Sequence, residues 1–324
     1  MLDRMNGESK MMPSTSVQRF VSRFAFVGVL GASLTSAIMW MRAGVDPPLA
    51  LVISQVPAFL TLMLLERWVP YHQPWNQSNG DLSVDIRHGL TITITAGLAD
   101  PLFRAIGLAV AFGLLGGHSL SLWPSEWPVL GQLALALVLG ELGQYWVHRM
   151  QHEVDFMWRF HALHHSAPRL YWLNAARFHP VDIFLNNLVA IVPLALLGAG
   201  EEVLVLWTLF SAVHGIFQHS NIPMRIGPLN WIFSMAELHR WHHSRLVDES
   251  NRNYGQNLIV WDIVFGTRFL PAHREPPRDI GLHGLSAYPM SWWAQQMAPF
   301  HWRRICAASA HPEAPPEGHN SPLK

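Results

Sequence analysis

The chain has 324 residues, of which 50% are apolar and only 14% are charged, and its mean hydropathy is +0.16. Soluble domains carry about 25% charged residues, so this composition excludes an ordinary soluble globule, and it also excludes a disordered chain. The formal net charge of zero argues against nucleic-acid binding, and the single cysteine, Cys306, excludes a disulfide framework or a cysteine-rich zinc module. Two enrichments need an explanation: 15 tryptophans, which favour membrane interfaces, and 19 histidines.

Long apolar segments follow a polar N-terminal stretch, residues 1–19, which we expect to be flexible. Four of these segments are candidate transmembrane helices: 24–41, 48–65, 89–117 and 128–147. The first two have about the length needed to cross a hydrocarbon core of ~30 Å. The third contains Asp100, Pro101 and Arg104, so we expect it to form a kinked or re-entrant helix pair.

A fifth apolar block, 181–217, is divided by the polar and glycine-rich stretch 198–202. Each half has about 15 residues, which is short for a complete crossing of the bilayer. We therefore expect this block to form a re-entrant helical hairpin that dips into the membrane.

Basic residues predict the orientation, because Lys and Arg accumulate on the cytoplasmic side of membrane proteins. If the N-terminus is cytoplasmic, 20 of the 22 Lys and Arg residues lie on that side, in four segments: 1–23, 67–88, 148–180 and 217–324. The sequence thus predicts an all-α, polytopic integral membrane protein with about four transmembrane helices, the re-entrant hairpin and a cytosolic, helical, His-rich cap. We expect the tail, 307–324, to be disordered.

Eight histidines form three clusters with regular spacing. The clusters are one HxxxH, with His148 and His152, and two HxxHH, with His161, His164 and His165, and with His239, His242 and His243. On a helix, residues three and four apart share a face. Adjacent residues are about 100° apart, so the two members of each HH pair can reach different ions. This spacing predicts a centre with two metal ions.

The histidine pattern leaves the metal open. No HExxH motif is present, which excludes the common zinc metalloprotease site. Imidazole binds zinc, copper, iron and nickel, and eight histidines would fill two four-coordinate zinc sites. A larger number of ligands would favour iron, because five- or six-coordinate metals leave room for O₂.

Three further residues are candidates by position. His179 and His219 lie at the two ends of the hairpin, where the clusters must converge, so we count them as candidate ligands. Glu141 lies two helical turns before His148, and we expect its carboxylate to bond the second nitrogen of a ligating imidazole. We interpret His214, inside the apolar block, as a packing residue or as a residue behind the ligands.

The order of the three histidine clusters, or histidine boxes, resembles that in the fatty acid hydroxylase / sterol desaturase superfamily of membrane di-iron enzymes. The segments around the boxes are similar to those of this family: Tyr145–Arg149, Arg177–Pro180, Gln218–Ser220, Asn253–Gly255 and Trp261–Thr267. The resemblance covers about residues 85–270. It implies a catalytic domain in 85–270. The apolar segments before it predict N-terminal transmembrane helices in 20–84, and residues 271–306 are expected to form a C-terminal extension.

The resemblance also implies a function. Members are membrane enzymes of the endoplasmic reticulum or the bacterial inner membrane that use two iron ions (Fe²⁺/Fe³⁺) and O₂ as co-substrate. They hydroxylate or desaturate a membrane lipid such as a sterol, a fatty acyl chain or a related isoprenoid or ether lipid. Electrons come from a separate protein such as a cytochrome or a ferredoxin.

By the same resemblance, the eight clustered histidines together with His179 and His219 are metal ligands, and Asp262 joins Glu141 behind them. Glu141 occupies a position where many members have Asp, so its contact with the ligands is a point to examine. The alternative function is a polytopic protein that binds or transports metal. A transporter would hold its ligands near the bilayer midplane, whereas these clusters lie outside the apolar segments.

Overall fold

In the computed structural model, residues 15–114 and 122–310 are described. Within these residues all the regular secondary-structure elements are helices, and the only β structure is a pair of isolated bridges. This confirms the all-α class. Six long helices are α1 (Ser16–Arg42), α2 (Pro47–Trp68), α3 (Leu82–Leu114), α4 (Val129–Glu153), α6 (Pro180–Leu197) and α7 (Glu201–Gln218).

The remaining elements are short. The α-helices are α5 (Asp155–His165), α8 (Ala236–His242), α9 (Val247–Ser250), α10 (Val260–Val264), α11 (Trp292–Met297) and α12 (Trp302–Ala310). The 3₁₀ turns are η1 (Gln73–Asn76), η2 (Trp172–Ala176), η3 (Gly227–Trp231) and η4 (Ala298–His301).

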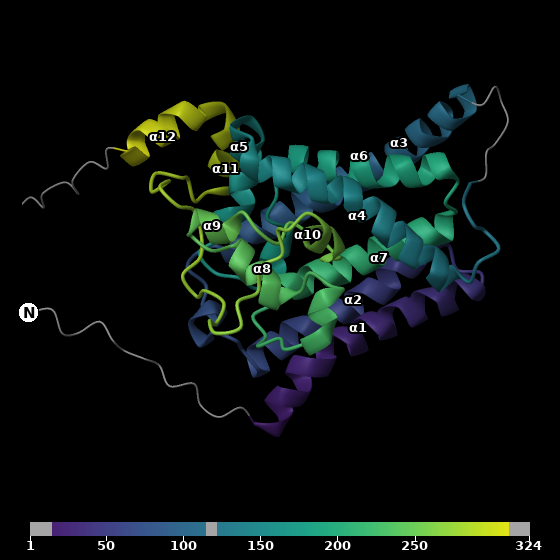
Figure 1. Cartoon of the computed structure of the whole chain (residues 1–324), viewed down its shortest axis with the longest axis horizontal. Coiled ribbons are helices and arrows are strands. Elements are labelled where there is room, and N and C mark those ends of the chain that lie inside the picture. The colour runs from purple at the N-terminus through teal and green to yellow at the C-terminus, as the bar shows by residue number, and fades with distance from the viewer. Residues whose placement is uncertain (1–14, 115–121, 311–324) are drawn as a thin grey trace, which may run out of the picture.

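The six long helices lie side by side as a bundle, and the short helices gather at one end of it as a cap (Figure 1). Helix α6 packs against α3 and α4, while α7 packs against α1, α2 and α4. Because α5 and α8–α12 all lie at the same end, every histidine cluster is brought to that end.

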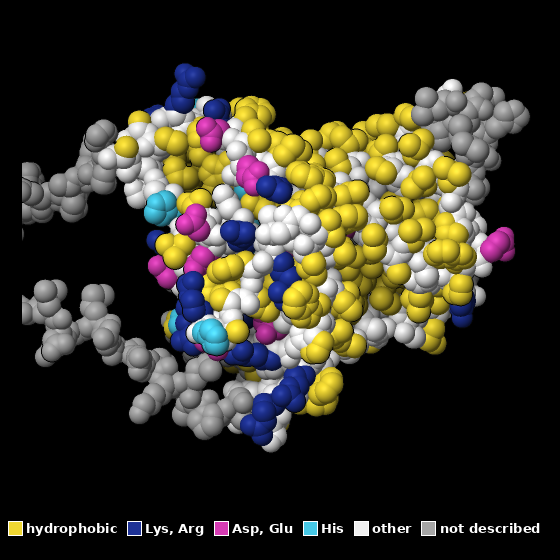
Figure 2. All heavy atoms as spheres, viewed as in Figure 1, with side chains coloured by type: hydrophobic (Ala, Val, Ile, Leu, Met, Phe, Trp, Pro, Cys, Tyr) yellow, Lys and Arg dark blue, Asp and Glu magenta, His cyan; other side chains and the backbone are white. Residues whose placement is uncertain are grey.

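The surface divides along the same axis. Hydrophobic side chains cover the bundle, and most charged side chains in this view lie on the cap (Figure 2). On α3, Leu90, Ile94, Leu98 and Leu102 follow one another at every turn, and each is at least half exposed. Such a continuous apolar exterior would be unstable in water, so it indicates a membrane protein with a polar end outside the hydrocarbon.

Four helices among the described residues are long and apolar enough to cross a membrane, as expected, but they are not the expected four. They are α1, α2, residues Leu82–Val110 of α3, and α6. Helix α4, expected as the fourth, is not among them. Helix α3 continues through Pro101 as one helix, which corrects the expected helix pair.

The block forms two helices, α6 and α7, joined at residues 198–200, but the two pack on α4 rather than on each other, so they are not the closely paired hairpin expected from the sequence. Each arm has 18 residues rather than about 15, and α6 alone has the length and apolarity of a spanning helix. At the two ends of the chain, α1 already begins at Ser16, and α12 continues to Ala310. The rest of the termini expected to be disordered, 1–14 and 311–324, lies outside the described residues.

Glycines allow α6 to approach its neighbours closely. At Gly143 of α4, an added Cβ would lie 2.7 Å from the carbonyl oxygen of Val189. At Gly107 of α3, it would lie 2.7 Å from the Cβ of Ala195. Since backbone cannot move aside as a flexible side chain can, these two positions fix how α6 packs between α3 and α4.

We expect Gly143→Ala to destabilise the protein by about 1–3 kcal/mol, because the new methyl group overpacks the contact between α4 and α6. The control is Gly97→Ala on α3, where an added Cβ would meet nothing within 4 Å. Thermal unfolding of both variants in detergent measures the effect. Equal unfolding temperatures for the two variants would contradict this account of the packing.

Candidate metal centre

Nine histidines from four helices and their ends converge inside the cap. Helix α4 contributes His148 and His152 from its last turns. Helix α5 begins two residues after α4 ends, and its histidines, His161, His164 and His165, lie close to those of α4. Helix α8 brings the third box, and His219 is the C-terminal cap of α7. All nine are buried except His152, which is partly exposed.

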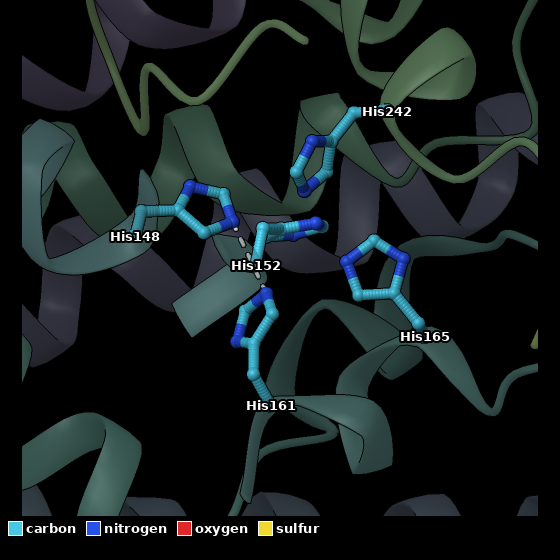
Figure 3. Close-up of side chains that lie close together, drawn as sticks. All are labelled: His148, His152, His161, His165 and His242. Carbon is cyan, nitrogen blue, oxygen red and sulfur yellow. Dashed lines mark hydrogen bonds between the residues drawn. The ribbon is translucent and has the colours of Figure 1, made fainter. Parts of the chain in front are cut away.

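The nine imidazoles form two groups, and in each group one nitrogen per ring lies within 4.8 Å of all the others. The first group consists of His148, His152, His161, His165 and His242 (Figure 3). The second consists of His164, His219, His239 and His243. The neighbouring histidines of each HH pair go to different groups, as the 100° angle between adjacent helical residues requires.

In the first group, acceptors behind the rings fix the orientation of three imidazoles. His148 donates from Nδ1 to the carbonyl oxygen of Tyr254 at 2.6 Å, and His242 donates to that of Arg252 at 2.8 Å. The Nδ1 of His152 lies 3.1 Å from the side-chain oxygen of Asn251. Because a carbonyl oxygen can only accept, Nδ1 of His148 and His242 carries the proton and Nε2 is left with a free lone pair.

The second group is organised in the same way. His164 donates from Nδ1 to the carbonyl oxygen of Arg177 at 3.2 Å, and Nδ1 of His219 lies 2.9 Å from the side-chain oxygen of Asn174. The Nε2 atoms of His219 and His243 each lie 3.0 Å from Nε2 of His239.

These imidazoles fit a bound cation. Several buried ring nitrogens have no hydrogen-bond partner: Nε2 of His152, His165 and His242, and Nδ1 of His161, His239 and His243. Burial, and then the neighbouring histidines, lower the pKa of His161, His165 and His243 well below 6.5. Burial, with the charge of Arg177, lowers the pKa of His219 to about 3. The rings are therefore neutral, so each keeps one nitrogen lone pair that a metal ion can use.

His179 is not brought into either group. It is the N-cap of α6, and its Nδ1 accepts a hydrogen bond from the backbone N–H of Val181 at 3.1 Å. Its Nε2 lies 3.2 Å from the carbonyl oxygen of Gln296. Both ring nitrogens are thus occupied, and the ten converging histidines expected from the sequence are reduced to nine.

Glu141 and Asp262 are both buried behind the site, but neither bonds an imidazole. The Glu141 carboxylate accepts hydrogen bonds from the backbone N–H groups of Gln256 and Asn257. Asp262 accepts from the backbone N–H groups of Tyr254 and Gly255, both at 2.8 Å. Both carboxylates therefore contact the histidines only indirectly: they hold the loop that contains Tyr254, and the carbonyl oxygen of Tyr254 orients His148.

Sequence reasoning missed other side chains that contact the converging histidines. Asp182 is fully buried, and its Oδ2 lies 3.7 Å from Nδ1 of His161. Its Oδ1 accepts a hydrogen bond from Gln151. A signal for Asp182 was available, since it is an acidic residue just inside an apolar segment, where a carboxylate is costly unless it is used. Asn174 and Asn251 carry no such signal, because isolated asparagines are common in loops.

A helical membrane protein with two groups of converging neutral histidines has side chains that could hold metal ions. Comparison with known proteins defines the class further, because the model of the fatty acid hydroxylase family matches residues 133–267. The chain belongs to this family.

Curated relatives are lipid-modifying enzymes. The chain is 37% identical to ornithine lipid hydroxylase OlsE of Rhizobium tropici over 293 residues, which cover 89% of this chain and 86% of that protein. It is 29% identical to human alkylglycerol monooxygenase over 214 residues, 65% of this chain and 46% of that protein. It is 27% identical to methylsterol monooxygenase 2-2 of Arabidopsis thaliana over 169 residues, 52% of this chain and 60% of that protein. No solved structure matches the chain.

The chain therefore spans most of the bacterial hydroxylase but only about half of the human alkylglycerol monooxygenase. These relatives identify an oxidoreductase that uses O₂ and acts on a membrane lipid. They confirm the enzyme class expected from the sequence and do not favour the metal-transport alternative.

Metal-free protein should lose stability when the pH falls below about 6.5, the pKa of an unperturbed histidine. In that range the unfolded chain takes up protons that the buried, neutral rings do not, so stability falls by up to about 1.4 kcal/mol per pH unit for each such histidine. Denaturant unfolding in detergent at pH 7.5 and pH 5.5 measures this. A variant with His239→Gln and His243→Gln should show a smaller pH dependence. Equal stability at the two pH values would contradict neutral burial of the rings.

Proposed function

We propose that this protein is a multi-pass membrane di-iron monooxygenase that hydroxylates a C–H bond of a polar lipid. The observation that carries the proposal is the convergence of nine neutral imidazoles, in a group of five and a group of four, at the polar end of an apolar bundle. Membership in a family of lipid hydroxylases and monooxygenases agrees with this chemistry.

The nine histidines would hold two iron ions, with one ion in each group. Five ligands in the first group exceed the four that zinc usually takes in structural sites, which favours iron. Bound iron would supply the redox chemistry for O₂ activation, as metal cofactors do in other oxygenases. The complete reaction consumes O₂, two electrons and two protons, converts C–H to C–OH, and releases one water.

The side chains of the chain itself have three tasks. The histidines would bind the metal ions, and the carbonyl acceptors behind Nδ1 of His148, His164 and His242 keep Nε2 of these three rings unprotonated. Burial of eight of the nine rings excludes bulk water from the centre. A lipid chain would enter the centre from the apolar bundle, at whose polar end the histidines converge.

Ornithine lipid is the first candidate substrate, because the relative that covers most of this chain carries that name. Alkylglycerol ethers are the second candidate. We further propose that the N-terminus and the cap face the cytoplasm, since the basic residues accumulate in these segments. A separate electron-transfer protein would then reach the centre from the cytoplasm.

Expression in a bacterium that produces ornithine lipids tests the proposed reaction. The chain should add about 16 mass units to the substrate lipid, which is the signature of hydroxylation. His165→Ala and His243→Ala should abolish the product, whereas His273→Ala and His301→Ala, at exposed positions outside both groups, should keep it. A loss of two mass units would indicate desaturation, and no change in any lipid class with iron-loaded protein would contradict the proposed function.

Reporter fusions test the orientation. Fusions after Val45 and after Ser125 should report a non-cytoplasmic position, and a fusion after His165 should report a cytoplasmic one, on the proposal that α4 crosses the membrane together with α1, α2 and α3. A non-cytoplasmic signal after His165 would reverse the proposed topology.

A further inference from the structure

Two separate loops lie behind the two groups of histidines. The first loop, 251–257, provides the acceptors for His148, His152 and His242 of the first group. The second loop, 169–177, provides the acceptors for His164 and His219 of the second group. Each group thus has its own source of orienting hydrogen bonds.

Asn174 has a fixed orientation in the second loop. Its Nδ2 donates to the carbonyl oxygen of Arg169, and its Oδ1 accepts from the backbone N–H of Tyr171 at 3.2 Å. These two bonds decide which end of the amide is the oxygen. The oxygen therefore faces Nδ1 of His219 at 2.9 Å, so His219 must donate from Nδ1 and keep the lone pair on Nε2.

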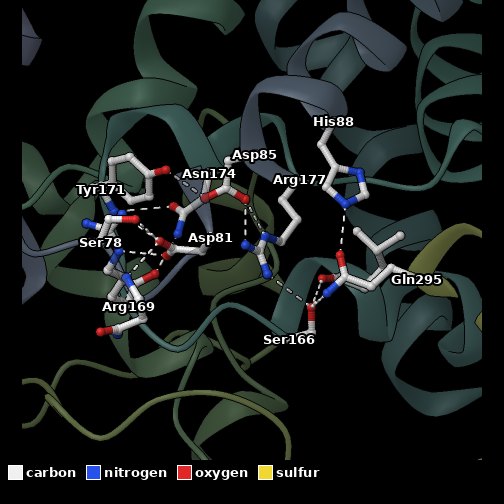
Figure 4. A network of polar contacts seen from close by, with 12 residues as sticks. Ser78, Asp81, Asp85, His88, Ser166, Arg169, Tyr171, Asn174, Arg177 and Gln295 are labelled. Atoms are coloured by element: carbon white, nitrogen blue, oxygen red, sulfur yellow. Dashed lines mark hydrogen bonds and ion pairs between the residues drawn. The ribbon is translucent and has the colours of Figure 1, made fainter. Parts of the chain in front are cut away.

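Two buried ion pairs hold the second loop against the start of α3 (Figure 4). Arg169 donates to both carboxylate oxygens of Asp81, at 2.7 and 2.9 Å. Arg177 donates to Asp85 at 2.7 Å, and the other oxygen of Asp85 accepts from the hydroxyl of Tyr171 at 2.7 Å. All four charged side chains are less than 5% exposed, so solvent does not screen these pairs.

A third carboxylate joins the second loop to the histidine it orients. Glu66, buried at the end of α2, accepts hydrogen bonds from the backbone N–H of Trp172 and from that of Asn221, both at 2.8 Å. Asn221 follows His219 by two residues. The distance between the amide of Asn174 and the ring of His219 is thereby fixed from both sides.

Different carboxylates hold the first loop. Glu141 of α4 and Asp262 of α10 accept from its backbone N–H groups at residues 254–257. The second loop depends on residues 66, 81 and 85, which precede the region matched by the family model.

We infer that Asn174 is the positioning residue for the metal ion of the second group, and that the two ions are supported independently by the two loops. This inference rests on the proposed two-metal function. Loss of a partner behind a ligating histidine typically weakens metal binding by about 10–100-fold. Removal of the Asn174 oxygen should therefore weaken one ion by that factor and leave the other ion unchanged.

Titration of metal-stripped protein with Fe²⁺ under anaerobic conditions, and in parallel with Co²⁺, tests the inference. The wild-type chain should bind two ions tightly. Asn174→Leu and Asn174→Ala remove the acceptor, so each should keep one tight ion and bind the other about 10–100-fold more weakly. Asn174→Asp keeps an acceptor oxygen toward His219 and should bind both ions within a few-fold of wild type.

A matched variant acts on the other loop. Asn251→Leu removes the acceptor behind His152 and should weaken the ion of the first group. Combined with His219→Ala, which disables the second site, Asn251→Leu should still weaken the remaining ion. Asn174→Leu in the same background should not, because its only target has already been lost.

The outcomes separate the two proposals. Wild-type protein that binds fewer than two ions would overturn the proposed function, and the inference with it. Wild-type protein that binds two ions, together with Asn174 variants that weaken neither ion or weaken both equally, would overturn the inference alone. If the Leu and Ala variants do not fold, a tenfold weakening in Asn174→Asp would overturn it as well.

Discussion

The rest of the structure depends on one constraint: nine neutral imidazoles must lie together inside the cap, each with a lone pair available. A protonated imidazole would repel its neighbours, and a neutral one keeps its inward nitrogen unprotonated when the outward nitrogen has an acceptor for its proton. The chain meets this constraint for five of the nine rings by placing an acceptor oxygen behind Nδ1 of His148, His152, His164, His219 and His242. The tautomer of a ring is thus decided by a loop rather than by the helix that carries it.

Loops that decide tautomers must themselves be rigid, and this explains the buried carboxylates around the site. Glu66, Asp81, Asp85, Glu141 and Asp262 are each less than 5% exposed, and each accepts hydrogen bonds from a loop backbone or from a loop arginine or tyrosine. Burial raises the pKa of Asp262 to about 6, while its bonds from Thr267 and from two backbone N–H groups lower it. Isolated buried carboxylates would be costly, and these are acceptable because their lone pairs are occupied.

The sequence predicted the helical class, the apolar bundle and eight of the nine converging histidines from their boxes, because helical spacing alone places residues three and four apart on one face. Position alone makes His219 and His179 equal candidates. The geometry brings His219 into the second group and leaves His179 outside both groups. The difference is local. His219 ends a helix and points past its last turn, whereas His179 begins one and caps it with its own ring nitrogen. The spacing between histidines cannot distinguish these cases, because it does not show whether a ring nitrogen is already used in a cap, as that of His179 is by the backbone N–H of Val181.

The parts that sequence could not predict are those in which distant segments meet. The acceptor for His219 comes from a residue 45 positions earlier, and the carboxylates that hold this acceptor come from the end of α2 and the start of α3. No periodicity links them to the boxes. Residues before the family-matched region therefore help to hold the loop behind His164 and His219, in addition to forming α1 and α2. On the proposal made for Asn174, a chain with intact histidine clusters but an altered α2–α3 connection would keep all nine histidines and lose the support for the hydrogen bond that orients His219.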